Sequence, residues 1–201
     1  MKRALHLKSG ARAVLLVLVA GAAAIAAPHA HAQTALAAKE APVAKEKNPP
    51  GDIPDDQVFV AYDSPLGFSL QVPEGWARTE TADSVAFADT YGQVSAGIKP
   101  AAGPLTAASV RAKEAAELEN TGHSVKISAI TEVRLPAGAA VKIAYSANSD
   151  ANPVTGKKIR LEFERFLMLH GDKIATLTFS SPAGADNVDQ WLLMSQSFRW
   201  Q

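Results

Sequence analysis

The sequence predicts an α+β domain in which an antiparallel β-sheet is flanked by helices. Most segments after residue 58 alternate apolar and polar residues with a period of two, which is typical of β-strands. Short turn sequences such as Leu135–Gly138 and His170–Asp172 join the longest of these segments, and strands joined in this way pair antiparallel. Two further segments space their apolar residues as helices do, so we expect two helices packed on the sheet.

The first 32 residues have the three-part layout of a secretory signal peptide. A basic start without acidic residues precedes the apolar run Ala13–Ala27, which is shorter than the roughly 20 residues that a membrane-spanning helix needs. Ala30-His31-Ala32 is a small-x-small cleavage site, so we expect cleavage between Ala32 and Gln33 after export by the Sec route. The mature protein is then periplasmic or secreted, with no later transmembrane segment and, for lack of cysteine, no lipoprotein anchor or disulfide.

Removal of the signal peptide changes the charge balance. The full chain has 20 basic and 20 acidic residues, and the loss of Lys2, Arg3, Lys8 and Arg12 leaves 16 against 20, a net charge of −4. A nucleic-acid-binding protein needs a basic face, so this balance argues against a nucleic-acid partner.

Residues 33–57 are rich in Ala, Pro, Lys and Glu and show no apolar periodicity, which predicts a flexible linker. The alternative is an arm that becomes ordered on a partner. Asp52, Asp55 and Asp56 lack the spacing of a calcium-binding EF-hand loop, so we expect no such site there.

Residues 58–201 form the expected domain. Its predicted strands are 58–62, 68–72, 85–87, 94–98, 125–135, 141–147, 159–169 and 175–179. The residues between the apolar positions are mostly polar, which predicts one buried face and one largely solvated face. Arg165 is the exception, because it falls in phase with Phe163 and Leu167. A charge on the buried face must be paired or reach water, and a β-bulge that shifts the strand is an equally good interpretation.

Two helices complete the domain. Thr106 can cap a helix that runs to about Glu119. The final helix is predicted to begin at an Asp186 cap and to cover the apolar face of the sheet. Its expected apolar side consists of Val188, Trp191, Leu192, Ser195 and Phe198.

The mature chain offers little catalytic chemistry. His123 and His170 are its two histidines, each beside a glycine at a predicted turn, without the companions of a metal site. No nucleophile motif is present, so we expect no enzyme, cofactor or metal. Glu162 and Glu164 lie two residues apart on one strand and are interpreted as a solvated, salt-bridged surface with Arg160 and Lys142.

A basic group at the predicted hairpin of residues 148–160 is the candidate binding surface. Lys157, Lys158 and Arg160 could contact a protein partner or acidic lipid, or only solvate the end of the hairpin.

Three segments in order along the chain resemble the PsbP family of extrinsic photosystem II subunits: Tyr62–Trp76, Phe87–Asp89 and Asp172–Pro182. The resemblance extends over about Val58–Gln201. It implies an antiparallel sheet between helices and a non-enzymatic accessory role, which in photosynthetic members includes retention of calcium and chloride. The sequence lacks the lipobox cysteine of cyanobacterial members, and none of the matched motifs supplies a metal ligand.

These observations favour an exported, non-catalytic PsbP-like accessory protein that binds an envelope or membrane-complex partner, with peripheral membrane contact as one form of that binding. One alternative is a periplasmic protein that holds a small molecule or lipid between sheet and helix. Another, implied by the resemblance, is a photosystem II extrinsic subunit with a calcium-retention role. A third is an unrecognised hydrolase.

Overall fold

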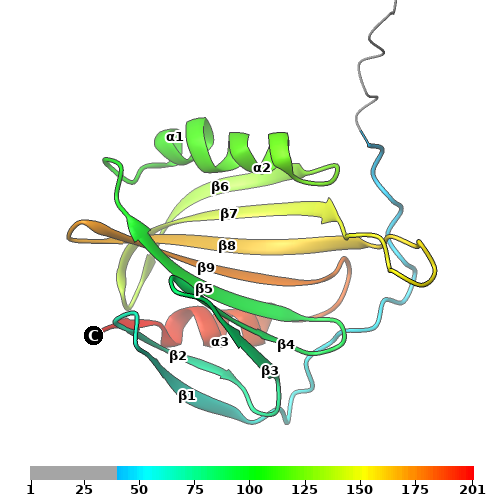
Figure 1. Cartoon of the computed structure of the whole chain (residues 1–201), viewed down its shortest axis with the longest axis horizontal. Helices are drawn as coiled ribbons and strands as arrows, with labels where there is room; N and C mark the ends of the chain where they lie inside the picture. The colour runs from blue at the N-terminus through cyan, green and yellow to red at the C-terminus, as the bar shows by residue number, and fades with distance from the viewer. Residues whose placement is uncertain (1–39) are drawn as a thin grey trace, which may run out of the picture. The chain divides into compact units, whose positions relative to one another are not determined.

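The computed structural model describes residues 40–201, so the expected signal peptide, its cleavage site between Ala32 and Gln33, and residues 33–39 lie outside the described residues. The described residues confirm the predicted α+β fold, an antiparallel sheet with helices on both sides (Figure 1). The strands are β1 Phe59–Ser64, β2 Phe68–Pro73, β3 Ala77–Glu80, β4 Ser84–Ala88, β5 Gln93–Pro100, β6 Lys126–Leu135, β7 Gly138–Asn148, β8 Arg160–His170, β9 Lys173–Pro182 and β10 Arg199–Trp200.

Two sheets make up the β-structure. Seven strands form one antiparallel sheet in the order β3-β4-β5-β9-β8-β7-β6, and β1, β2 and β10 form a smaller one. The strands β6 to β9 follow one another as hairpins, as the turn sequences predict. β5 then pairs with β9, which places Ala96 opposite Leu177 and joins the two halves of the chain in one sheet.

Helices and the small sheet cover the two faces of the seven-stranded sheet at different places. On one side, called the α3 face, lie α3 (Val188–Ser197) and the small sheet. On the other side, called the α1 face, lies a helical segment that consists of α1 (Ala107–Val110), a π-helical turn η1 (Arg111–Ala115) and α2 (Ala116–Thr121) (Figure 1).

Each face has its own core. The α3-face core is the larger, and Phe179 stacks on Trp191 there at 5.8 Å between ring centres. Its fully buried large side chains include Phe68, Leu70, Met168, Leu177, Phe179, Met194 and Phe198. The α1-face core is built from Val110, Val141, Ile143, Tyr145, Leu167 and Ile174.

The expectation of one buried and one solvated face is wrong. In β8, Phe166 and Met168 are buried on the α3 face, and Leu167 is buried on the α1 face. Arg165 lies on the α1 face opposite Thr178, and the register of β8 with both neighbours is continuous, so the bulge interpretation is wrong as well. The alternation of apolar and polar residues does not predict which side chains are buried here, because each face of the sheet is covered over part of its area.

The first helical segment begins as predicted. Thr106 caps it: its hydroxyl accepts a hydrogen bond from the N–H of Ser109, and the Ser109 hydroxyl accepts one from the N–H of Thr106. The helical backbone continues to Thr121, slightly beyond the predicted end at Glu119.

The final helix differs more from its prediction. Its N-cap is Asn187 instead of Asp186, and Phe198 follows the helix on extended backbone, although it is fully buried. The buried residues of the helix are Trp191, Met194 and Ser195. The expected apolar side is therefore wrong at two positions, because Val188 is 71% exposed and Leu192 is 51% exposed.

Residues 40–57, called the arm from here on, lie along the domain, and the flexibility of this predicted linker stays a prediction (Figure 1). Ile53 is buried in the α3-face core, and its N–H donates to Oδ1 of Asn187 at 2.6 Å. The Asn187 amide donates in turn to the carbonyl of Gly51. Near the start of the arm, the N–H of Val43 donates to Oδ1 of Asn148 at 2.9 Å. Single contacts of this kind produce no periodic pattern in the sequence, so they could not be predicted from the composition of the arm.

Within residues 40–201, none of the helices has the length and apolar character that crossing a membrane requires.

Candidate functional site

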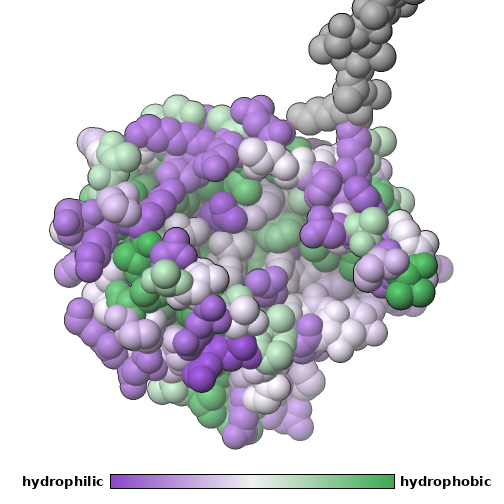
Figure 2. Space-filling view, viewed as in Figure 1, coloured by the Kyte–Doolittle hydropathy of each residue, from purple (hydrophilic) through white to green (hydrophobic). Residues whose placement is uncertain are grey.

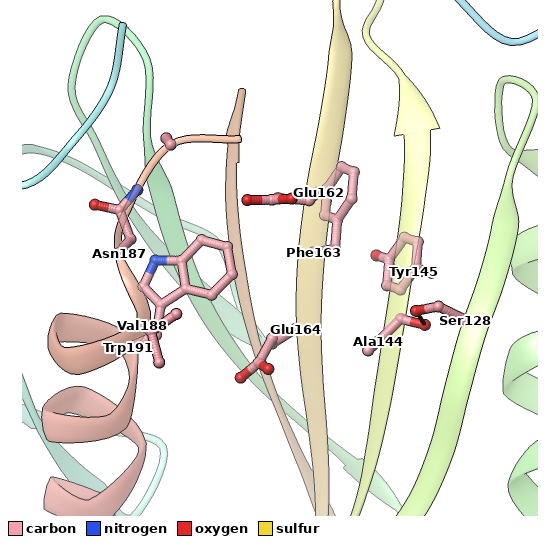
Figure 3. Close-up of a pocket in the computed structure, with 10 residues that line it drawn as sticks. Ser128, Ala144, Tyr145, Glu162, Phe163, Glu164, Asn187, Val188 and Trp191 are labelled. Atoms are coloured by element: carbon pink, nitrogen blue, oxygen red, sulfur yellow. Dashed lines mark hydrogen bonds between the residues drawn. The ribbon is translucent and has the colours of Figure 1, made fainter. Parts of the chain in front are cut away.

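A cleft of about 270 Å³ lies on the α3 face, where the cover provided by α3 ends (Figure 3). Strands β6 to β8 form its floor with Ser128, Ala144, Glu162 and Glu164, and the start of α3 forms its wall with Ala185, Asn187, Val188 and Trp191. Two floor residues leave space because they are small: Ala144 carries only a methyl group, and the Ser128 hydroxyl donates back to the Ala144 carbonyl at 2.8 Å.

Two carboxylates give the cleft its charge. Oε1 of Glu164 lies 2.8 Å from Nζ of Lys142, and Oε2 of Glu162 lies 3.8 Å from Nζ of Lys45 in the arm. The side chains of Glu162 and Glu164 are 31% and 28% exposed, so both remain accessible beside these partners. Figure 3 shows both side chains extending from β8 toward the wall that carries Trp191. The predicted pairing of Glu164 with Lys142 is confirmed, whereas Arg160 points elsewhere.

Apolar side chains of α3 border the cleft. Val188, which lines it, and Leu192 lie four residues apart and share one side of the helix, and Leu193 is 42% exposed beside them. We call Val188, Leu192 and Leu193 the α3 ridge. Trp191 faces inward and is only 8% exposed, so the buried side of the helix holds the core without any contribution from the ridge.

The predicted basic surface of Lys157, Lys158 and Arg160 is bound to the chain itself. Nζ of Lys157 lies 2.6 Å from Oε1 of Glu46, and Nζ of Lys158 lies 3.0 Å from Oε1 of Glu40. These two lysines contact the arm, and their binding to a protein partner or acidic lipid stays a prediction.

Arg160 is only 6% exposed, so its interpretation as a surface residue is also wrong. Its guanidinium donates to the carbonyl of Ser124, to Oδ1 of Asn148, and to the carbonyl and hydroxyl of Ser146. Burial lowers the pKa of this guanidinium from its ordinary value. Its oxygen partners show that it stabilises the ends of β7 and β8.

The two histidines lie apart. The ring nitrogens of His123 lie 3.0 Å from Glu40 and 3.1 Å from Asp150, which joins the arm to the loop after β7. The His170 ring stacks on Trp200 at 5.1 Å between ring centres. Among residues 40–201, no group of three or more His, Cys, Asp or Glu side chains is arranged to hold a metal ion.

Sequence reasoning singled out Glu162, Glu164 and Lys142 as a salt-bridged surface, and it did not predict the cleft or its wall. Asn187 and Ala185 carry no motif, and Lys45 reaches Glu162 from the arm across more than a hundred residues of sequence. The sequence of α3 did contain a signal for the ridge. Trp191 and Met194 are enough to form the buried side of the helix, so the additional apolar residues Val188, Leu192 and Leu193 indicate a second apolar surface.

This architecture defines the class of fold: the chain has a PsbP-like fold. Among solved structures, cyanobacterial PsbP from Synechocystis superposes with a TM-score of 0.51 and 15% identity, covering 75% of this chain and 98% of that chain. The Ran-binding protein Mog1p of Saccharomyces cerevisiae gives a TM-score of 0.47 at 9% identity, covering 71% of this chain and 95% of that one. LpqN of Mycobacterium tuberculosis, described as involved in cell envelope biogenesis, gives 0.45 at 15% identity, covering 71% and 89%.

No family model matches the chain, and no curated protein sequence matches it. At such low identity the structural likeness shows the fold alone.

Proposed function

We propose that this protein is an exported, non-catalytic accessory protein that binds a protein partner through the α3 ridge and the adjoining cleft. The observation that carries the proposal is the exposure of Val188, Leu192 and Leu193 at 71%, 51% and 42% beside a cleft. Exposed apolar residues that gather around a cleft are typical of protein interaction sites. These exposed side chains do not contribute to the core. A partner that covers them would explain why apolar residues stand at these positions.

The dimensions of the cleft favour a partner's side chain as its occupant. Pockets for drug-sized molecules are roughly 300–1,000 Å³, and this cleft measures about 270 Å³. One inserted side chain would meet the carboxylates of Glu162 and Glu164 on one side and Trp191 on the other. This is the arrangement of a small anchor pocket beside an apolar contact surface.

The test is capture of envelope partners by cross-linking, with variants that separate the ridge from the rest of the surface. Leu192→Lys should lower capture about 30-fold, since a central apolar anchor is worth about 2 kcal/mol or more. Val154→Lys is the matched control, because Val154 is 90% exposed on the loop between β7 and β8, away from the ridge. Equal capture by wild type and Leu192→Lys would refute the ridge as the binding surface.

A small-molecule ligand is the second candidate, and the position of the cleft between sheet and helix favours it. Native mass spectrometry of protein purified from its own envelope distinguishes the two, because a resident ligand adds a fixed mass that Trp191→Leu should remove.

The non-catalytic part of the proposal has its own test. Glu162 and Glu164 are the paired carboxylates of the cleft, so a hydrolase using it would depend on them. Turnover in a broad hydrolase screen that Glu162→Gln or Glu164→Gln abolishes without unfolding the protein would overturn the proposal.

Export is tested by intact-mass analysis of protein from the periplasmic fraction. We expect a mature species that begins at Gln33. A species that retains residues 13–27 would show that the segment is a retained anchor.

A further inference from the structure

The α1 face carries an open area that the proposed function does not use. The helical segment Ala107–Thr121 and the residues before it pack over β6, β7 and the adjoining parts of β8 and β9, including Ile174. Within residues 40–201, no further helix or strand covers the remainder of this face on β8, β9, β5 and β4. Figure 2 shows a hollow of weakly polar residues there, below the helical segment. The register places a row of half-buried side chains across its floor: Arg165, Thr178, Ser95 and Ala86.

Arg165 is the charged group in this row. Its Nε donates to Oγ1 of Thr178 at 3.1 Å, and its guanidinium carbon lies 5.8 Å from the centre of the Tyr145 ring. No carboxylate within residues 40–201 lies within 4.0 Å of it. A half-buried positive charge without a counter-ion is costly, so a site that holds one commonly serves an anion.

Two other half-buried or buried cations show the contrast. Arg160 donates to oxygens of Ser124, Ser146 and Asn148, so its guanidinium is satisfied within the fold. Lys142 is paired with Glu164. The fork of Arg165, in contrast, is held in position by Thr178 and Tyr145 with its charge uncompensated.

One acidic residue of the helical segment is paired with a lysine of the sheet. Glu114 of η1 lies 3.2 Å from Nζ of Lys99, which projects from β5 on the same face as Ser95 and Gly97. The helix therefore leaves the charge of Arg165 available to a ligand.

On the side toward β9, β5 and β4, the floor beside Arg165 consists of small and hydroxyl-bearing residues, with Asp83 and Lys99 at its edge. Thr176, Gly97 and Ser84 form a second row beside the first. Hydroxyl groups can donate to an anionic oxygen, and Gly97 leaves space for close approach.

An aromatic pair borders the other side of Arg165. Phe163 stacks on Tyr145 with 4.6 Å between ring centres and 3° between planes. Phe163 is two residues from Arg165 on β8, on the same face and roughly 7 Å away at the rise of a strand. Burial raises the pKa of Tyr145, and the neighbouring Arg165 guanidinium opposes this shift.

We propose that this hollow binds a small organic anion, with a carboxylate or phosphate on the Arg165 fork and a planar apolar group against Phe163. Its charged group, Arg165, lies on the α1 face, whereas the α3 ridge lies on the opposite face. Phe163 and Tyr145 also border the cleft beside the ridge, so the shifts of Arg165, Thr178 and Ser95 are the ones that distinguish this site from the cleft.

The experiment is an NMR titration of the ¹⁵N-labelled purified protein with benzoate and phenyl phosphate, with benzyl alcohol as the neutral analogue. We expect saturable shifts at Phe163, Arg165, Thr178 and Ser95, and no saturation with benzyl alcohol. Inorganic phosphate lacks the ring and should bind several-fold more weakly than phenyl phosphate. Because this map uses the wild-type protein, it tests the location without any variant.

Substitution then tests the guanidinium. Arg165→Gln should weaken binding at least about tenfold, since hydrogen bonds to a charged group contribute roughly that much or more. Arg165→Lys keeps the positive charge but lacks the planar guanidinium, so its affinity should lie between those of the wild type and Arg165→Gln. Arg134→Gln is the matched control, because Arg134 is an exposed arginine on β6. Three results would overturn the proposal: no saturable shifts, shifts elsewhere on the protein, or equal affinity in Arg165→Gln with its folding confirmed by thermal unfolding.

Discussion

The two faces of the seven-stranded sheet use the same strands but are covered to different extents. The α3 face is covered by a helix and a second sheet, and it buries Phe68, Phe179 and Phe198 completely. The α1 face is covered by one helical segment, which buries Val110 against Leu167 and its neighbours. The difference shows that the placement of the covering elements, more than the alternation of residues, decides which side chains are buried.

Both proposed sites lie where the cover ends. On the α3 face, Glu162 and Glu164 lie just beyond the buried Phe166 and Met168 of the same strand. On the α1 face, Arg165 lies two residues before the buried Leu167 on β8 and is opposite Thr178, where the cover ends. The offset between the two covers therefore leaves one accessible area on each face of β8.

The largest expected effect is on the α3 face. Trp191→Ala removes a ring that stacks on Phe179 and should lower the free energy of unfolding by about 3–5 kcal/mol, as truncations of large core aromatics do. Denaturant unfolding followed by circular dichroism measures it. A loss below about 1 kcal/mol would show that α3 does not hold the core together.

A matched pair of leucines compares the two faces directly. Leu177 on the α3 face and Leu167 on the α1 face are both fully buried, and each Leu→Ala change should cost about 2–5 kcal/mol. We expect the larger loss for Leu177→Ala, because the single helix over Leu167 can settle into the cavity more easily than two covering elements can. Equal losses in the same denaturant experiment would show that the faces are equally rigid.

The fold class could be predicted from the sequence, because strand alternation, turn sequences and the Thr106 cap are local signals. The site could be predicted only in part. Glu162 and Glu164 were noted for their spacing but interpreted as a solvated, salt-bridged surface, because the neighbours that make a cleft of them, such as Trp191, come from α3 and its start. Arg160 was misplaced because its burial depends on oxygens of Ser124 and Ser146, which become neighbours only after folding.

The arm extends the comparison, because one of its ends belongs to the α3-face core. Ile53 is 6% exposed there, so Ile53→Ala should lower the free energy of unfolding by about 2 kcal/mol, the lower end for such truncations. Deletion of residues 40–57 should cost at least as much. Val58→Ala is the control, because Val58 is 56% exposed and its truncation should change stability by less than about 0.5 kcal/mol. An arm deletion with unchanged thermal unfolding would restore the interpretation of a free linker.

The other end of the arm is held by polar contacts, and its expected effect is the smallest. Hydrogen bonds from Asn148, Lys158 and His123 lower the pKa of Glu40 to about 2 from an ordinary value of 4.5. Because the pKa is lower in the folded state, the stabilisation is fully present above pH 4.5 and is lost as the pH falls toward 2. The NMR signal of the Val43 N–H, which is bonded to Asn148, should therefore keep its position at pH 4 and move only at lower pH.

Two variants make this last experiment specific. Glu40→Gln should abolish the acid transition of the Val43 signal, whereas Glu46→Gln, which removes the arm carboxylate paired with Lys157, should leave it in place. The carboxyl carbon of Glu40 reports the same protonation directly. A midpoint near pH 4.5 would show that Asn148 and Lys158 do not hold the carboxylate of Glu40 in solution.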